Sequence, residues 1–267
     1  MHNKELDIYL RSAIKAAKES GQFLLENLGK IRLDEVNSKR TFDFVTHIDL
    51  ESEESIIRCI REEYPDHAIL AEETGEKAAP GAYTWIIDPL DGTTNYIHEN
   101  PVFSVSIALK YNDELLLGVV FDPNRNELFH AIKNEGAFLN QNKISVSKID
   151  DMSKALIATG FPFRRKDLIE QYLNSFAEIF KLCAGIRRAG SAALDLCYVG
   201  CGRLDGFWEI GLSIWDICAG VLIIKEAGGA VSDFLGGNDF WGSGNIVAGN
   251  QIIFENISDI TRHAFRS

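Results

Sequence analysis

Two aspartates three residues apart form the part of this sequence with the clearest chemical potential. Asp88 and Asp91 follow the apolar run Trp85–Ile87, whose aromatic and β-branched side chains predict a buried strand. Pro89 has no backbone N–H, so we expect the strand to end at Asp88. Gly92–Asn95 is typical of a turn that opens a short helix, and free N–H groups at a helix start bind phosphate.

These carboxylates would repel a phosphate ester unless cations stood between the two groups. Mg²⁺ prefers carboxylate, phosphate and water oxygens as ligands, and it activates water for attack on phosphate esters. The stretch Asp88–Asn95 therefore predicts a Mg²⁺ site and a phosphorylated substrate. Asp-Pro and Asp-Gly are also common in ordinary turns, so the motif alone favours neither a metal site nor a structural turn.

Further carboxylates of the first half also lie at the ends of predicted elements. Thr46 and Asp49 have the spacing of a capping box, which predicts a helix over residues 47–64 and gives Asp49 a capping role. Glu72–Glu73 follow the predicted buried strand His67–Ala71, so they repeat the arrangement of carboxylates at a strand end. A solvated turn is the simpler interpretation of two adjacent glutamates. Asp49 becomes functional only if its helix start faces the same cleft as the aspartate pair.

The second half repeats this pattern with Glu209 and Asp216. Glu209 lies inside the aromatic strand Gly206–Ile210, where a buried carboxylate costs free energy unless it has a partner. Asp216 precedes the hydrophobic helix predicted over 217–224, where an N-cap role is the ordinary explanation. Gly190–Ala193 is a turn of small residues that opens a further helix, which suits either close approach of a ligand or tight packing.

The elements that must position these side chains fall into two groups. Alternating strands and turn residues predict a large, mostly antiparallel sheet in the first half, behind a helix at Leu6–Leu28. Its later strands are predicted at Phe103–Leu109, Leu115–Phe121, Glu127–Ile132 and, as a pair, Gly136–Val146.

The second half predicts a smaller mixed sheet, with the site between the two sheets. Its remaining strands are predicted at Ala155–Gly160, Ile186–Arg188, Ala230–Phe234 and Ile246–Ala248, and its other helices at Asp167–Phe180, Ala193–Gly200 and Gln251–Phe265. We expect a single unit over residues 1–267, with sub-parts of about 1–150 and 151–267.

Composition and charge argue against several functions. The formal net charge is −12 and no basic stripe is visible, which makes nucleic acid unlikely as the main partner. The cysteines number five and include no Cys-x-x-Cys pair, so free thiols in a reducing cytoplasm are predicted. The N-terminus has no signal-peptide core, and no apolar run reaches about eighteen residues, so we expect no membrane span.

Taken in chain order, these motifs resemble the inositol monophosphatase family, part of a lithium-sensitive superfamily of Mg²⁺-dependent phosphatases. The resemblance rests on Glu72–Glu73, Trp85–Asn95, Trp215–Gly220 and Glu226–Gly229. Ile186–Leu196 resembles the bacterial branch of the family. The resemblance covers nearly the whole chain and implies an α/β (α+β) fold, a layered α/β/α/β/α sandwich of the inositol monophosphatase and fructose-1,6-bisphosphatase type.

The resemblance also implies a role for each site residue, with two or three Mg²⁺ ions as cofactors. The metal ligands would be Glu72, Asp88, the carbonyl of Leu90, Asp91 and Asp216. The catalytic residues would be Asp49 and Thr93, which position the attacking water, and Glu72. The substrate contacts would be the amides of Gly92 and Thr93 for the phosphate, and Asp91, Arg187, Ala192, Glu209 and Asp216 for the polyol. Because water is the nucleophile in such a site, we expect no phosphoenzyme.

Inositol 1-phosphate is the substrate that the resemblance favours, within a class of small phosphorylated polyols and sugars. The segment Thr159–Arg164 differs from the animal members and lies where sugar specificity is decided, so other substrates stay open. Fructose-1,6-bisphosphate is the main rival, since Arg164, Arg165 or Arg187 could meet its second phosphate. Histidinol phosphate and 3′-phosphoadenosine nucleotides are weaker rivals. A hypothesis of another class is a regulatory, protein-binding role on the same fold. Family members are commonly dimers, so a homodimer is expected.

Overall fold

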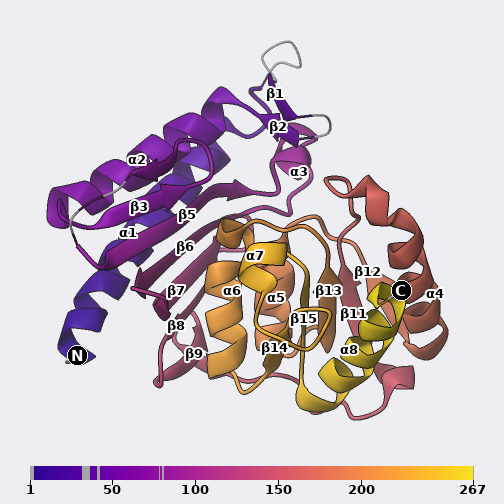
Figure 1. The fold of residues 1–267 in the computed structure, drawn as a ribbon. Helices are drawn as coiled ribbons and strands as arrows, with labels where there is room; N and C mark the ends of the chain where they lie inside the picture. Colours follow the sequence, from indigo (N-terminus) through magenta and orange to yellow (C-terminus); the bar gives the residue numbers. More distant parts are fainter. Residues whose placement is uncertain (1–2, 32–36, 41–42, 78, 80, 267) are drawn as a thin grey trace.

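The computed structural model describes residues 3–31, 37–40, 43–77, 79 and 81–266. These residues form two main sheets, one of eight strands and one of five, in separate layers (Figure 1). Helices lie between the two sheets and on their outer faces. A separate small hairpin joins β1 (Asn37–Arg40) to β2 (Asp43–Val45). The predicted layered α/β fold is confirmed.

The first half of the chain builds a sheet of eight strands in the order β10-β9-β8-β7-β6-β5-β3-β4. Its strands are β3 (Ala68–Ala71), β4 (Gly75–Lys77), β5 (Tyr83–Asp91), β6 (Ser104–Tyr111), β7 (Glu114–Asp122), β8 (Glu127–Ile132), β9 (Gly136–Leu139) and β10 (Asn142–Ile144). Neighbours pair antiparallel except β3 and β5, which run parallel. The long meander from β5 to β10 follows from short turns between alternating strands, as predicted.

The second half builds a sheet of five strands in the order β12-β11-β13-β15-β14. Its strands are β11 (Leu156–Thr159), β12 (Gly185–Arg187), β13 (Gly206–Glu209), β14 (Ala230–Ser232) and β15 (Ile246–Gly249). β11 pairs parallel with β12 and β13, whereas β15 pairs antiparallel with β13 and β14. The sheet is therefore mixed, as the sequence predicts.

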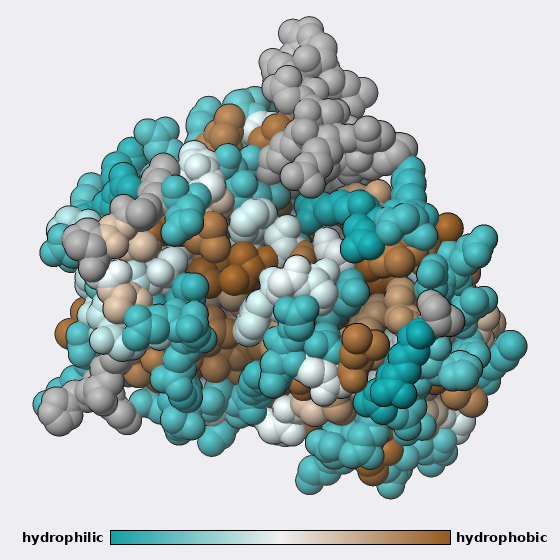
Figure 2. All heavy atoms as spheres, in the orientation of Figure 1, coloured by the Kyte–Doolittle hydropathy of each residue, from teal (hydrophilic) through white to brown (hydrophobic). Residues whose placement is uncertain are grey.

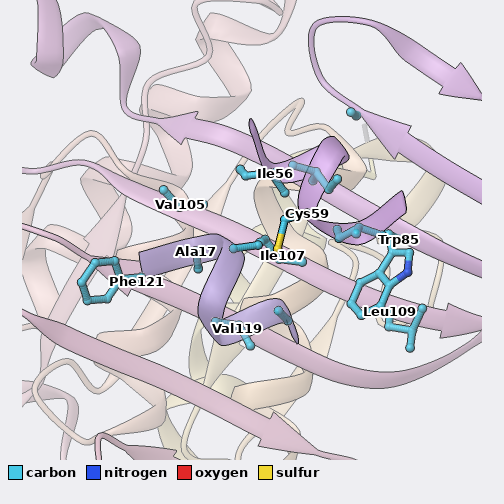
Figure 3. Close-up of a cluster of buried hydrophobic side chains, with 14 of the residues drawn as sticks. Ala17, Ile56, Cys59, Trp85, Val105, Ile107, Leu109, Val119 and Phe121 are labelled. Atoms are coloured by element: carbon cyan, nitrogen blue, oxygen red, sulfur yellow. The ribbon is translucent and has the colours of Figure 1, made fainter. Parts of the chain in front are cut away.

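Helices α1 (Asn3–Asn27) and α2 (His47–Glu63) cover the outer face of the large sheet. Strand residues that alternate along the sheet, such as Trp85 and Ile107, pack there against Ala17 and Ile56 of the helices (Figure 3). Each of these side chains is almost fully buried. Burial of such side chains contributes roughly 1.5–3 kcal/mol each before the cost of chain entropy is counted.

Helices α5 (Ala192–Gly200) and α6 (Ile214–Glu226) fill the space between the two sheets. The inner face of the large sheet, with Ile86 and Val120, packs on one side of them, and Phe207 of the small sheet packs on the other. A helix enclosed on all sides must be apolar all round, which explains the hydrophobic run at residues 217–224. A Cβ on Gly118 would lie 2.8 Å from Cα of Ala219, so this glycine allows α6 to approach β7 closely.

Helices α4 (Ile169–Leu182) and α8 (Gln251–Phe265) cover the outer face of the small sheet. Trp208 and Val247 point to this side, where they pack with Tyr172 of α4 and Ile253 of α8. The elements not yet introduced are short: α3 (Thr93–Ile97), α7 (Phe240–Ser243) and the 3₁₀ turns η2 (Met152–Lys154) and η3 (Lys166–Leu168). The order of layers is thus α, β, α, β, α.

The structure corrects two predicted boundaries. β5 does not end at Asp88 but continues through Pro89 to Asp91, with a register shift in its pairing with β6. Asp88 lies opposite Ser106 and Asp91 opposite Ser104, so β5 has one extra residue there. A bulge tolerates proline because the extra residue needs no ladder hydrogen bond.

The second correction concerns the start of α6. Ser213 is its N-cap, and Asp216 is the third helical residue, whose side chain accepts a hydrogen bond from the Ser213 N–H. The capping box therefore begins three residues before the position that the hydrophobic pattern indicates. Two further elements, β4 and α7, have no counterpart in the sequence prediction because each has at most four residues.

Candidate active site

A pocket opens between the two halves of the molecule, at the ends of strands and the beginnings of helices. From the first half it is lined by Glu72, Asp88, Leu90, Asp91, Gly92, Thr93 and Thr94. From the second half it is lined by Thr159, Gly160, Phe163, Arg164, Arg188, Gly190, Ser191, Ala192, Asp195, Glu209, Leu212 and Asp216. All five predicted metal ligands therefore line the same pocket.

The bulge in β5 explains how two aspartates three residues apart reach one pocket. In a regular strand, side chains three residues apart point to opposite faces of the sheet. The extra residue between Asp88 and Asp91 changes this alternation, so both carboxyls can line the pocket. The side chain of Asp88 also accepts a hydrogen bond of 3.0 Å from the N–H of Leu90, so it contacts the backbone of the bulge directly.

Asp91 connects the two halves of the protein. Its carboxylate accepts hydrogen bonds from the Ser191 hydroxyl and from the N–H groups of Ala192 (3.3 Å) and Ala193 (2.9 Å) at the start of α5. Burial raises the pKa of Asp91 to about 6, although these hydrogen bonds act in the opposite direction. The Ala192 N–H, predicted to contact a polyol, donates to Asp91 in this structure, and the polyol contact stays a prediction.

Glu72, Asp88 and Asp216 bring three more carboxyls to the pocket. Burial raises the pKa of Asp88, and the neighbouring charges of Glu72, Asp91 and Asp216 raise it further. Burial also raises the pKa of Asp216 to about 7, which Arg164 opposes from 3.5 Å away. The pocket therefore concentrates negative charge that the surrounding protein only partly neutralises.

The turn that carries Glu72 is held from behind by Glu53 on α2. The Glu53 carboxylate is fully buried and accepts hydrogen bonds from the N–H groups of Glu73 (2.7 Å) and Thr74 (2.9 Å). The N–H of Glu72 itself donates to the carbonyl of Ile87 on β5. Sequence reasoning missed Glu53 because nothing in its own segment distinguishes it from the other acidic residues of α2.

Asp49 lies behind Thr93, outside the pocket lining. Thr93 Oγ1 donates a 3.0 Å hydrogen bond to Oδ1 of Asp49, while Oδ2 of Asp49 accepts from the N–H (2.8 Å) and hydroxyl (2.6 Å) of Thr46. Asp49 therefore caps α2 and contacts Thr93 at the same time. Burial raises its pKa despite these hydrogen bonds.

The carboxyl set fits a divalent cation in its chemistry. Glu72, Asp88, Asp91 and Asp216 offer oxygen donors only, and the mutual repulsion that raises the pKa of Asp88 would be relieved by a cation between them. Among the residues that the structure describes, no three His, Cys, Asp or Glu side chains already stand in the arrangement of a metal site. Asp91 is hydrogen-bonded to the start of α5, and Asp216 pairs with Arg164.

The far end of the pocket carries Glu209, as predicted. Its carboxyl packs directly against Gly160, where a Cβ would lie only 1.8 Å from the carboxyl oxygen. An alanine at position 160 would therefore force the Glu209 carboxyl to move. Of the two arginines at the end of β12, Arg188 lines the pocket and reaches over the ring of Phe161 at 5.4 Å.

Arg187 does not line the pocket, which corrects the predicted polyol contact. It is exposed and donates to the carbonyl of Ile186. Successive residues point to opposite sides at a strand end, so the sequence alone does not decide between neighbouring arginines. Arg165, a second candidate for an additional phosphate, is also outside the lining and pairs with Asp167 at 2.8 Å. Of the arginines considered for a bisphosphate, only Arg164 reaches the pocket.

Comparison with known proteins gives consistent matches over almost the whole chain. The profile of the inositol monophosphatase family matches residues 5–264. The protein named Nus factor SuhB from Pseudomonas aeruginosa is 47% identical over 251 residues, which span 92% of this chain and 93% of that protein. The Escherichia coli protein of the same name is 47% identical over 242 residues, or 90% of this chain and 91% of the relative.

Solved structures show the same similarity. The extragenic suppressor protein SuhB from Bartonella henselae superposes with a TM-score of 0.93 at 38% identity, covering 96% of this chain and 98% of that chain. The inositol monophosphatase from Anabaena superposes with a TM-score of 0.87 at 39% identity, covering 97% of each chain.

Proposed function

The chain belongs to the inositol monophosphatase family, and we propose that it is a Mg²⁺-dependent phosphomonoester hydrolase that converts inositol 1-phosphate to myo-inositol and phosphate. The observation that carries this proposal is the convergence of Glu72, Asp88, Asp91 and Asp216 on one pocket beside the start of α3. Such a set suits a reaction in which cations and a phosphate ester share one site.

The ions would be held by Glu72, Asp88, the Leu90 carbonyl, Asp91 and Asp216. Bound Mg²⁺ would lower the pKa of water to give a nucleophile near neutral pH and would offset charge on the leaving oxygen. All five groups belong to residues that line the pocket, and they come from both halves of the chain.

The chain's own groups position the reactants around the metal ligands. Gly92 turns the backbone from β5 into α3 with φ of 101°, and the N–H groups of Gly92 and Thr93 hold the phosphate. Thr93 donates its hydroxyl hydrogen to Asp49, so its oxygen can accept a hydrogen bond from the attacking water. In this proposal the nucleophile is water activated at the metal site, so no phosphoenzyme is expected.

The experiment that tests this proposal is phosphate release by the purified protein with and without Mg²⁺. The substrates are inositol 1-phosphate, fructose-1,6-bisphosphate, histidinol phosphate and a 3′-phosphoadenosine nucleotide, with Asp216→Asn as the inactive control. We expect Mg²⁺-dependent turnover that is highest for inositol 1-phosphate and is lost in the variant. If the protein releases phosphate from none of the four substrates, the proposal is contradicted.

We also propose that the protein acts as a homodimer through an apolar surface on and before α4. This surface consists of Phe161, Ile169, Leu173 and Phe180, each at least 41% exposed, and the last three share one face of α4. On the right-hand side of Figure 2, where Figure 1 places α4, brown apolar atoms are visible among the teal hydrophilic surface. Concentrated exposed apolar groups favour association. Analytical ultracentrifugation should therefore show a dimer, and Leu173→Glu should shift it to a monomer; a monomeric wild type would contradict this proposal.

A regulatory, protein-binding role is the second candidate function. The observation that favours it is that relatives 47% identical to this chain are named as a factor, Nus factor SuhB, rather than as a phosphatase. If binding is separate from hydrolysis, Asp216→Asn should lose phosphatase activity but retain its protein partners in salt-resistant co-purification. Co-purifying RNA that is lost at high salt would instead contradict the expectation, based on the net charge of −12, that nucleic acid is not the main partner.

We further propose a cytoplasmic location, supported by the five cysteines, all of which are free thiols. In the part of the chain that the structure describes, no helix is both long enough and apolar enough to span a bilayer.

A further inference from the structure

Asp195, which the proposed mechanism does not use, lines the end of the pocket that also carries Glu209 and Arg188. It is the fourth residue of α5, one turn beyond the N-cap Ser191, and lines the pocket together with Ser191 and Ala192. Residues three and four apart share one face of a helix, so the start of α5 directs this carboxyl to the same side as the small residues that line the pocket. Its side chain is 2% exposed.

The carboxyl of Asp195 has an unused hydrogen-bonding atom. Within the described part of the chain, its Oδ1 is the only fully buried carboxylate oxygen without a hydrogen-bond partner. Other buried aspartates are satisfied: Asp205, for example, accepts a 2.7 Å hydrogen bond from the N–H of Leu156. A buried polar atom without a partner costs free energy, so its retention beside a pocket points to a ligand rather than to folding.

The surroundings of Asp195 indicate what kind of ligand group it would bind. Glu209 and Arg188 line the same end of the pocket, and their charges interact with each other and with Asp195. Two carboxyls beside one guanidinium provide an excess of acceptor oxygens, which suits hydroxyl groups and disfavours a second phosphate. A carboxyl oxygen accepts a hydrogen bond from a hydroxyl group in either protonation state.

We propose that Asp195 is a further specificity-determining residue, whose buried carboxyl oxygen accepts a hydrogen bond from a hydroxyl group of the leaving alcohol. This inference rests on the proposed phosphatase function. It assigns the end of the pocket that carries Asp195, Glu209 and Arg188 to a polyhydroxylated leaving group. A site built to bond a hydroxyl group discriminates strongly against an analogue that lacks it.

The test compares two substrates in the Mg²⁺-loaded protein: inositol 1-phosphate and p-nitrophenyl phosphate, whose leaving group has no hydroxyl substituent. Asp195→Ala should lower kcat/KM for inositol 1-phosphate by about 10- to 100-fold, the loss typical of a hydrogen bond to a carboxylate. The value for p-nitrophenyl phosphate should change by less than about twofold. Asp195→Asn keeps one acceptor oxygen and the volume, so its loss should be smaller.

The midpoint of thermal unfolding separates specificity from structure. Because Oδ1 of Asp195 has no partner, Asp195→Ala should leave the midpoint unchanged or raise it, whereas the matched variant Asp205→Ala should lower it and keep the substrate ratio. The inference is overturned if Asp195→Ala leaves the ratio of the two kcat/KM values unchanged, or if it lowers the unfolding midpoint. Either result would leave the phosphatase function intact. Absence of activity on both substrates in the wild-type protein would overturn the proposed function and this inference together.

Discussion

Replacing Asp216 with asparagine should abolish most activity and yet stabilise the metal-free protein at neutral pH. Asp216 is 7% exposed, and burial raises the pKa of its carboxyl from 3.8 to about 7, although Arg164 opposes the shift. A carboxyl whose pKa is higher in the folded than in the unfolded state stabilises the fold while it is protonated. This stabilisation is complete below about pH 4 and is lost as the pH rises through about 7.

The size of the effect follows from the pKa difference. A rise from 3.8 to about 7 corresponds to about 4 kcal/mol of unfolding free energy, at about 1.4 kcal/mol per pKa unit. Asparagine retains an oxygen for the N–H of Ser213, which donates to Asp216 at 2.7 Å, but it loses the charge interaction with Arg164. The pKa of about 7 already includes this attraction, and the protonated aspartate lacks it as well. We therefore expect Asp216→Asn to exceed the wild type by about 4 kcal/mol at pH 8 and to equal it near pH 4.

Urea unfolding of both proteins in EDTA, from pH 4 to pH 8, measures this difference. Asp91, whose pKa is raised to about 6, adds a pH-dependent loss of stability to both proteins. This loss should be smaller in the variant, because the charges of Asp91 and Asp216 repel each other in the wild type. Phosphate release at saturating Mg²⁺ should fall at least about 100-fold in the variant, because a predicted metal ligand is lost.

Asp233→Asn is a matched control outside the pocket. Its buried carboxylate accepts hydrogen bonds from the N–H groups of Leu235, Gly237 and Asp239, so this variant should lose stability and keep activity. A stability difference between Asp216→Asn and wild type that does not vary with pH would refute the electrostatic reasoning. A variant destabilised in step with its loss of activity would refute the catalytic role of Asp216.

Four further variants test the geometry of the pocket. Gly160→Ala places a Cβ where the Glu209 carboxyl now lies, so kcat/KM for inositol 1-phosphate should fall by at least about tenfold, while the thermal midpoint reports any global damage. Arg188→Ala should raise KM and Arg187→Ala should not, since only the first lines the pocket; equal effects in steady-state kinetics would contradict this placement. Glu53→Gln should weaken Mg²⁺ binding by roughly tenfold, measured by calorimetric titration, with kcat at saturating Mg²⁺ retained. Unchanged Mg²⁺ affinity would show that Glu53 does not position the metal-ligand turn.

Signals that act over a few residues made much of the fold predictable. The capping-box residue Thr46 predicts the start of α2, and Asn250, whose side chain accepts from the N–H of Ile253, precedes α8 at the expected boundary. The meander was predictable because its turns are short and its strands alternate or form apolar runs. The same local patterns predicted one large and one smaller sheet. The order of the layers came from the family resemblance.

The details of the pocket depended on contacts between distant residues and could not be predicted in the same way. The bulge at Asp88–Asp91 is fixed by pairing with β6, and the choice between Arg187 and Arg188 depends on how β12 pairs with β11. Asp195 lay within a motif that the sequence analysis quoted, yet only the burial of α5 between the sheets reveals that its carboxyl has no partner. Local patterns thus identify the residue types, and register decides which of them reach the site.

The position of the site between the two sheets has a physical reason. Bringing several carboxyls together is unfavourable, so the backbone that carries them must be held by packing that does not involve the charges themselves. Helices α5 and α6 provide that packing, since the apolar faces of both sheets close on them and their first turns meet Asp91 and contain Asp216. The same two helices thereby stabilise the fold and place carboxyls from both halves within one pocket. A change in the α5–α6 contact, such as Gly220→Ala against Leu196, should therefore disturb metal binding and stability together, because the same contact supports both.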